Sequence, residues 1–123
     1  MVELKAICWL EISGSIWTVN LSPGTLYEIV FVVMIKGASI DISNIRHISE
    51  FSLQLGINPP HSKSITHDVS LREKPSDQWI EIQVGEFLMS PQMVGHTRFY
   101  LKETSPPWKR GLLVKCAVIR PKN

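Results

Sequence analysis

The sequence predicts an all-β fold, an antiparallel β-sandwich of the jelly-roll kind, and three observations support this. Several stretches alternate apolar and polar residues with period two, as half-buried strands do. Clusters of Gly, Pro, Ser and Asn separate these stretches and predict turns. No stretch sustains the 3.6-residue period of an amphipathic helix. Many short strands with turn signals and no helices are typical of sandwiches and jelly rolls.

Five stretches predict strands, and they lie at 4–12, 26–36, 79–87, 96–103 and 112–119. One or two further strands are expected between residues 37 and 76, around 50–55 and 65–71. The run 26–36 is apolar on both faces, which predicts a central strand covered on both sides.

The stretch 96–103 alternates most cleanly. Phe99 and Leu101 are expected to face the core. The residues that alternate with them are then expected to face solvent; these are Arg98, Tyr100 and Lys102.

Length and composition predict one globular domain over residues 1–123. The chain is 44% apolar and 20% charged, which is ordinary for a folded domain. Its net charge of +2 is too small for a protein that binds nucleic acid mainly by neutralising phosphates. Charges interrupt the N-terminal segment and no apolar run is long enough to span a bilayer. We therefore expect a cytoplasmic protein with no membrane partner, with entry into the nucleus left open.

Two cysteines, Cys8 and Cys116, lie near opposite ends of the chain. Both sit in apolar runs, so two buried free thiols in a reducing compartment are the favoured interpretation. A bridge between them, or between two subunits, is the alternative.

Motifs for catalysis and cofactor binding are lacking. The sequence has no Gly-rich phosphate loop, nucleophile elbow, metalloprotease motif or zinc-finger spacing. His61, His67 and Asp68 could in principle share a metal, but a loop with scattered polar residues is the favoured interpretation because nothing fixes their geometry. A glycan hydrolase would need paired carboxylates, which the sequence does not suggest. We expect no enzyme activity, no metal and no cofactor.

The four tryptophans are the candidates for a sugar contact, while the sugar itself is implied only by the family resemblance given below. A sugar presents an apolar C–H face and a rim of hydroxyls, so its site needs an exposed aromatic ring and a few polar groups. Trp9 and Trp79 lie within predicted strands, where packing on the sheet is the better interpretation. Trp17 follows the first strand, where packing and ligand contact are equally plausible. Trp108 follows two prolines that restrict its loop, and Lys109 supplies a donor beside it.

Several motifs together resemble the phloem protein 2 family of plants, which includes the Nictaba-type lectins. They are Cys-Trp-Leu-Glu-Ile at 8–12, Leu-Ser-Pro-Gly-Thr-Leu-Tyr at 21–27, Trp-Ile-Glu-Ile-Gln-Val-Gly-Glu-Phe at 79–87, Trp-Lys-Arg-Gly-Leu-Leu-Val at 108–114 and Ile-Arg-Pro-Lys at 119–122. The resemblance covers nearly the whole chain. A more distant likeness is to the sugar-binding domains of F-box proteins that recognise N-glycans.

The resemblance implies a jelly-roll lectin that binds N-acetylglucosamine oligomers and the chitobiose core of N-glycans. It implies residence in the phloem sap or nucleocytoplasm and favours a homodimer. Carried over by position, the sugar contacts fall on Trp108, Lys109 and Ser22, and Trp17 and Asn20 are added because they are close in sequence. We expect the loop with Trp108 and Lys109 to face the turn from Trp17 to Ser22.

The family also suggests an alternative, a phloem module that binds RNA or protein and not sugar. The modest charge and the lack of a basic stripe argue against RNA. The lysine-rich run that serves some members as a nuclear signal has no counterpart here, so nuclear import is not implied.

Overall fold

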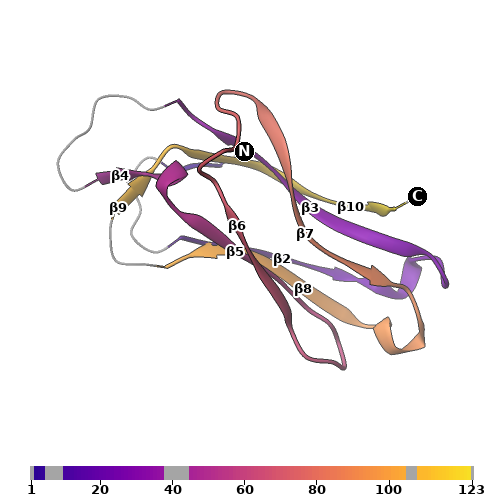
Figure 1. Ribbon diagram of the computed structural model, residues 1–123. Helices are drawn as coiled ribbons and strands as arrows, with labels where there is room; N and C mark the ends of the chain where they lie inside the picture. The colour runs from indigo at the N-terminus through magenta and orange to yellow at the C-terminus, as the bar shows by residue number, and fades with distance from the viewer. Residues whose placement is uncertain (1, 5–9, 38–44, 105–107, 123) are drawn as a thin grey trace.

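The computed structural model describes residues 2–4, 10–37, 45–104 and 108–122 (Figure 1). Strands account for most of these residues, and three short 3-10 helices join some of them. In chain order the elements are β1 (Val2–Leu4), β2 (Leu10–Trp17), η1 (Thr18–Asn20), β3 (Leu26–Ile35), β4 (Ile45–His47), η2 (Ile48–Glu50), β5 (Ser52–Asn58), β6 (Ile65–Ser70), β7 (Trp79–Leu88), η3 (Pro91–Met93), β8 (His96–Glu103), β9 (Trp108–Arg110) and β10 (Leu112–Pro121).

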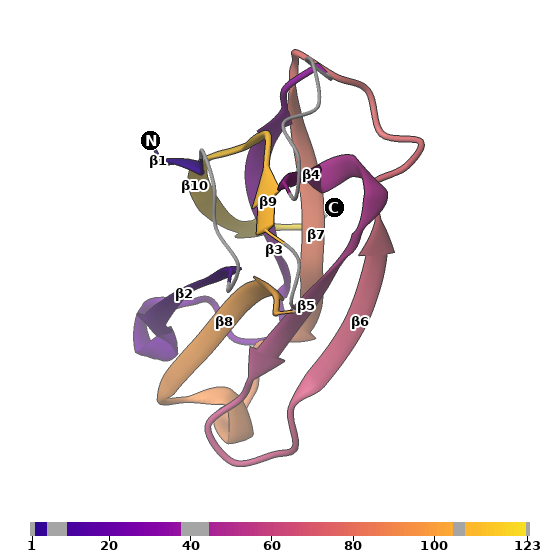
Figure 2. The same cartoon turned by 90° about the vertical axis from the view of Figure 1, so that its left-hand side faces the viewer.

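Two four-stranded antiparallel sheets make up the body of the molecule. One has the order β1-β10-β3-β7 and the other β2-β8-β5-β6. They lie face to face with their strands running in similar directions (Figures 1 and 2). From β6 onward the chain crosses to the other sheet at β7, back at β8 and across again to β10, as in jelly rolls. The predicted all-β antiparallel sandwich is confirmed.

The core lies between the two sheets and follows the predicted alternation. On β8, Phe99 and Leu101 are buried and their neighbours point outward. Phe31 of the opposite sheet meets Phe99 edge to face, with 5.8 Å between ring centres. Gly14 on β2 leaves the space that the Phe99 ring occupies, since a Cβ there would lie 2.7 Å from Phe99 Cζ.

The strand at 26–36 is central, as expected, but its outer face is less covered than predicted. It forms β3, between β10 and β7. Val30 is buried, whereas Val32 and Met34 are half-buried. Among the described residues, the neighbouring strands β10 and β7 flank this face and no further layer of secondary structure covers it.

Three features of the chain differ from expectation. The stretch at 4–12 divides, since β1 ends at Leu4 and β2 begins at Leu10 and continues to Trp17, with 5–9 outside the described residues. β4 and β9 form a short parallel pair that the sequence did not predict. Cys116 is exposed and unbridged, so its predicted burial is wrong, and Cys8 lies outside the described residues.

The described residues contain no helix long and apolar enough to cross a membrane. In the same ranges, no three His, Cys, Asp or Glu side chains gather as a metal site would require.

Candidate functional site

Trp17 presents its ring to solvent at the end of β2. The side chain is 64% exposed, the largest value among the exposed large apolar residues described. It stacks on His96, its partner on β8, with 4.5 Å between ring centres and 20° between ring planes. The stack fixes the orientation of the indole while leaving much of it accessible.

The turn after Trp17 is fastened to the rest of the fold by Thr18. This residue is fully buried, and its Oγ1 accepts a hydrogen bond from the Gly95 backbone N–H at 3.0 Å and donates to the Met93 carbonyl. The Thr18 N–H also donates to the Gly95 carbonyl at 3.0 Å. The turn therefore has little freedom, which lowers the entropy lost when a ligand binds to it.

Asn20 and Ser22 are exposed in this fastened turn. The Ser22 N–H donates to the Tyr27 hydroxyl at 2.8 Å, which ties the turn to β3. The Ser22 side chain remains at the surface. Trp17, Asn20 and Ser22 thus lie exposed within one short segment, which offers an aromatic ring and two short polar side chains.

Lys109 occupies a different environment from the one expected. Its side chain is fully buried, with Nζ 3.6 Å from Glu103 Oε1 and 5.4 Å from the centre of the Phe51 ring. Its ammonium has no solvent-exposed surface to offer a sugar. The residue before it, Trp108, pairs with Ile45 at the start of β9, and its side chain lies outside the described part of the structure.

The Trp108–Lys109 strand and the Trp17–Ser22 turn lie at opposite ends of the sandwich. β8 joins them: His96 pairs with Trp17 at one end, and Glu103 contacts Lys109 at the other. These eight residues span about 25 Å at roughly 3.4 Å per residue. Figure 1 shows β4 and β9 at the left end and the turn after β2 at the right end. The expectation that the two segments face each other is therefore wrong.

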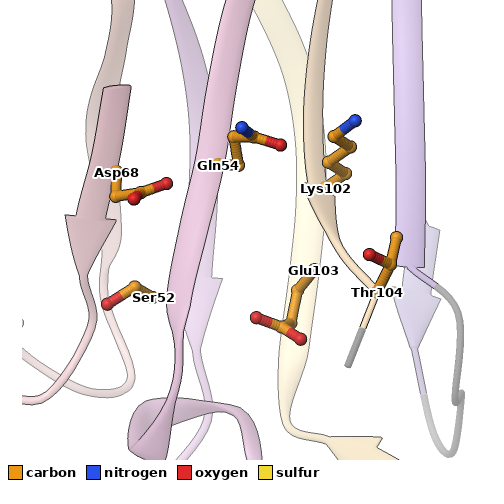
Figure 3. A pocket seen from close by; sticks show the side chains of 6 residues that line it. All are labelled: Ser52, Gln54, Asp68, Lys102, Glu103 and Thr104. Carbon is orange, nitrogen blue, oxygen red and sulfur yellow. The ribbon is translucent and has the colours of Figure 1, made fainter. Parts of the chain in front are cut away.

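The outer face of the β2-β8-β5-β6 sheet connects the two ends. An open hollow of about 430 Å³ lies near the Glu103 end (Figure 3). It is lined by polar side chains from β5, β6, β8 and the residue that follows β8: Ser52, Gln54, Asp68, Lys102, Glu103 and Thr104. The alternation of residues 96–103 predicted Lys102 on the outer face, but it did not predict the hollow. The hollow depends on the register of β5 against β8, which the sequence of one strand does not determine.

The outer face of the other sheet carries a group of ion pairs. The Arg120 guanidinium donates to both Glu81 oxygens, at 2.8 and 2.5 Å, and lies 3.5 Å from Glu28. The hydrogen bond from Arg120 holds the pKa of Glu81 below its usual value. Lys122 donates to Glu86 at 2.5 Å, and this bond raises the pKa of Lys122. These charges satisfy one another across β10, β3 and β7.

Similarity to known proteins covers the whole chain. A family model described as Phloem protein 2 matches residues 1–121. Phloem protein 2-like A1 of Arabidopsis thaliana is 37% identical over 123 residues, covering 99% of this chain and 48% of that protein. Phloem protein 2-like A2 of the same plant is 34% identical over 129 residues, covering 100% of this chain and 61% of that protein.

A protein from Luffa acutangula that carries the name lectin is 37% identical over 124 residues, covering 100% of this chain and 56% of that protein. The chain thus spans about half to three fifths of the length of these relatives. Because the family match extends over nearly every residue, this chain belongs to the phloem protein 2 family.

Proposed function

We propose that this chain is a carbohydrate-binding lectin domain without enzymatic activity, and that it recognises N-acetylglucosamine oligomers and the chitobiose core of N-glycans. The observation that carries the proposal is the exposed ring of Trp17, held against His96 beside Asn20 and Ser22. The relative from Luffa acutangula that carries the name lectin supports carbohydrate binding in general.

Trp17, Asn20 and Ser22 each have a role in this proposal. The indole stacks on the apolar face of a pyranose ring or on an N-acetyl methyl. Asn20 donates and accepts hydrogen bonds through its amide, and Ser22 does so through its hydroxyl, so the two match the hydroxyl and amide groups of the sugar. The site is shallow and open to water, so a single sugar ring would bind weakly.

Trp108 and Lys109 enter the proposal at the other end of the sandwich. Trp108 provides a second aromatic contact from β9. Lys109 acts indirectly, since its buried pair with Glu103 holds the strand that carries Trp108. The family resemblance adds a homodimer in the cytoplasm, phloem sap or nucleus as a further prediction.

Calorimetry with chitotriose tests the assignment. Trp17→Ala is expected to lower the affinity about tenfold, the equivalent of about 1.4 kcal/mol, because the stacking surface is lost. Val19→Ala is the matched control, since Val19 is equally exposed in the same turn and offers no ring. Trp108→Ala tests the second contact with the longer chitohexaose, because the two ends of the sandwich lie too far apart for one short sugar to touch both.

The possible results separate the site from the ligand class. Wild-type affinity in both tryptophan variants would reject these residues as contacts. Absence of chitotriose binding in the wild type, together with salt-sensitive RNA retention, would reject the lectin proposal in favour of the RNA-binding alternative.

A further inference from the structure

We infer that the outer face of the β2-β8-β5-β6 sheet is an extended subsite for neutral oligosaccharides, with Tyr100 as its central aromatic platform. The inference rests on the proposed function, because it continues the same sugar chain beyond the ring of Trp17. Four features carry it: the flat placement of Tyr100, the hollows beside it, their mixed polar lining and their alignment with Trp17.

Tyr100 lies flat because its partner on β5 is a glycine. Gly56 and Tyr100 pair directly across the sheet. A Cβ on Gly56 would lie 2.3 Å from Tyr100 Cζ and 2.4 Å from its hydroxyl oxygen, so the phenol occupies the space of the missing side chain. The ring covers the strand on one side and remains partly exposed. Lys102 Nζ lies 5.2 Å from the ring centre and brings a donor beside the platform.

Hollows flank this platform on both sides of Lys102. The one shown in Figure 3 lies toward Glu103. A second hollow, of about 250 Å³, lies toward Asn58 and is lined by Glu11, Asn58, Ser64, Arg98, Tyr100 and Lys102. Lys102 lines both hollows, so the two form neighbouring compartments of one polar face.

The lining favours a neutral ligand that both donates and accepts hydrogen bonds. Within the described ranges, neither Arg98 nor Lys102 has a carboxylate oxygen within 4 Å, and Arg98 Nη2 donates only to Ser13 Oγ, at 3.4 Å. Carboxylates line both hollows, Glu11 the smaller one and Asp68 and Glu103 the larger one. An anionic polymer would meet these carboxylates, whereas sugar hydroxyls can satisfy groups of both kinds.

The platform lies in line with the first contact. Trp17, His96 and Tyr100 all point to the outer face, since they occupy alternate positions on paired strands. Tyr100 follows His96 by four residues, which is about 14 Å along β8. A short sugar on Trp17 cannot reach Tyr100, but a longer oligomer can touch both rings.

Calorimetry with chitobiose and chitohexaose on the intact chain tests the inference. In the wild type, chitohexaose is expected to bind more tightly than chitobiose. Tyr100→Ala should weaken chitohexaose binding about fivefold and leave chitobiose binding unchanged. Gln83→Ala, at an exposed position on β7 of the other sheet, is the control and should change neither.

Gly56→Ala separates the flat placement of the ring from its mere presence. The added methyl should lift the phenol and weaken chitohexaose binding as much as Tyr100→Ala does. In the Tyr100→Ala background, Gly56→Ala should have no further effect, because no ring remains to be displaced. The double variant also removes the clash, so it keeps the test available if Gly56→Ala alone does not fold.

Each result decides a separate question. Wild-type chitohexaose affinity in Tyr100→Ala would overturn the extended subsite, and the lectin function would stand if Trp17→Ala still weakened binding. Absence of binding of both sugars to the wild type would overturn the proposed function and the subsite with it.

Discussion

The two sheets both carry charged side chains on their outer faces, but they use them differently. On the β1-β10-β3-β7 sheet, Arg120 lies between Glu81 and Glu28, and Lys122 lies against Glu86. On the β2-β8-β5-β6 sheet, Arg98 and Lys102 have hydroxyl and aromatic neighbours and no carboxylate within 4 Å in the described structure. The first face satisfies its own charges across its strands, whereas the second leaves donors available to a ligand.

A third arrangement, the buried pair of Lys109 and Glu103, gives the largest expected effect. Glu103→Gln should lower the free energy of unfolding by about 3 kcal/mol, because it deprives a buried ammonium of its carboxylate. Glu103→Gln combined with Lys109→Met should recover most of that loss, since no buried charge remains. Denaturant unfolding measures both, and equal stability of the wild type and Glu103→Gln would show that the pair does not hold this end.

A buried hydroxyl on β8 gives the next largest effect. Thr97 is fully buried on the inner side of the strand that carries Arg98, and its Oγ1 has no hydrogen-bond partner among the described residues. Thr97→Val keeps the shape and removes the polar atom, so it should raise stability by about 1 kcal/mol. A rise in the unfolding midpoint without a change in sugar affinity is the expected result. A loss of stability would mean that the hydroxyl has a partner after all.

A new carboxylate on the outer face of the β2-β8-β5-β6 sheet tests the role of Lys102. Gln54 pairs directly with Lys102 on β8 and with Asp68 on β6, so Gln54→Glu places a carboxylate beside an ammonium and opposite a like charge. The attraction and the repulsion oppose each other, so we expect little net change in the free energy of unfolding, and a modest loss of chitohexaose affinity because the Lys102 donor is now engaged. Unchanged chitohexaose affinity would show that Lys102 does not contact the ligand.

The pH dependence of the ion pairs on the β1-β10-β3-β7 sheet gives the smallest effect. The hydrogen bond from Arg120 lowers the pKa of Glu81 from its ordinary 4.5, so the charged form is favoured in the folded state. The stabilisation is therefore complete above pH 4.5 and is lost as the pH falls through the lowered pKa. The melting temperature of Glu81→Gln should lie slightly below that of the wild type at neutral pH and converge with it in acid.

Glu73→Gln is the matched control for this pH series. Glu73 is exposed in the loop between β6 and β7, and no described cation lies within 4 Å of it. Its variant should follow the wild type at every pH. A gap between the wild type and Glu81→Gln that persists in acid would assign the effect to packing and not to charge.

The faces of long strands were predictable from sequence because alternation is a local property. The stretch 96–103 predicted both the buried Phe99 and the outward Tyr100, and both predictions are confirmed. β4 and β9 were not predictable, since each has three residues and they pair in parallel across about sixty residues of chain. No local sequence pattern predicts such a long-range pairing.

The candidate site was predictable only where its members are neighbours in sequence. Trp17, Asn20 and Ser22 fall in one short exposed segment, which their proximity along the chain predicts, and their role in binding stays a prediction. Lys109 follows two prolines and a tryptophan, a context that suggested an exposed loop, but tertiary contacts with Glu103 and Phe51 bury it. The platform at Tyr100 depends on the register of β5 against β8, which neither strand encodes alone.

The pairing of Gly56 with Tyr100 offers a way to compare members of the family from sequence. A strand position that ordinarily favours a branched or aromatic residue here has no side chain. A relative with an aromatic residue at the β8 position and a larger residue opposite it would hold its ring upright and offer no flat platform. If the extended subsite exists, the residues at these two positions would indicate from sequence which relatives bind long glycans. Relatives without the pair would bind only short ones.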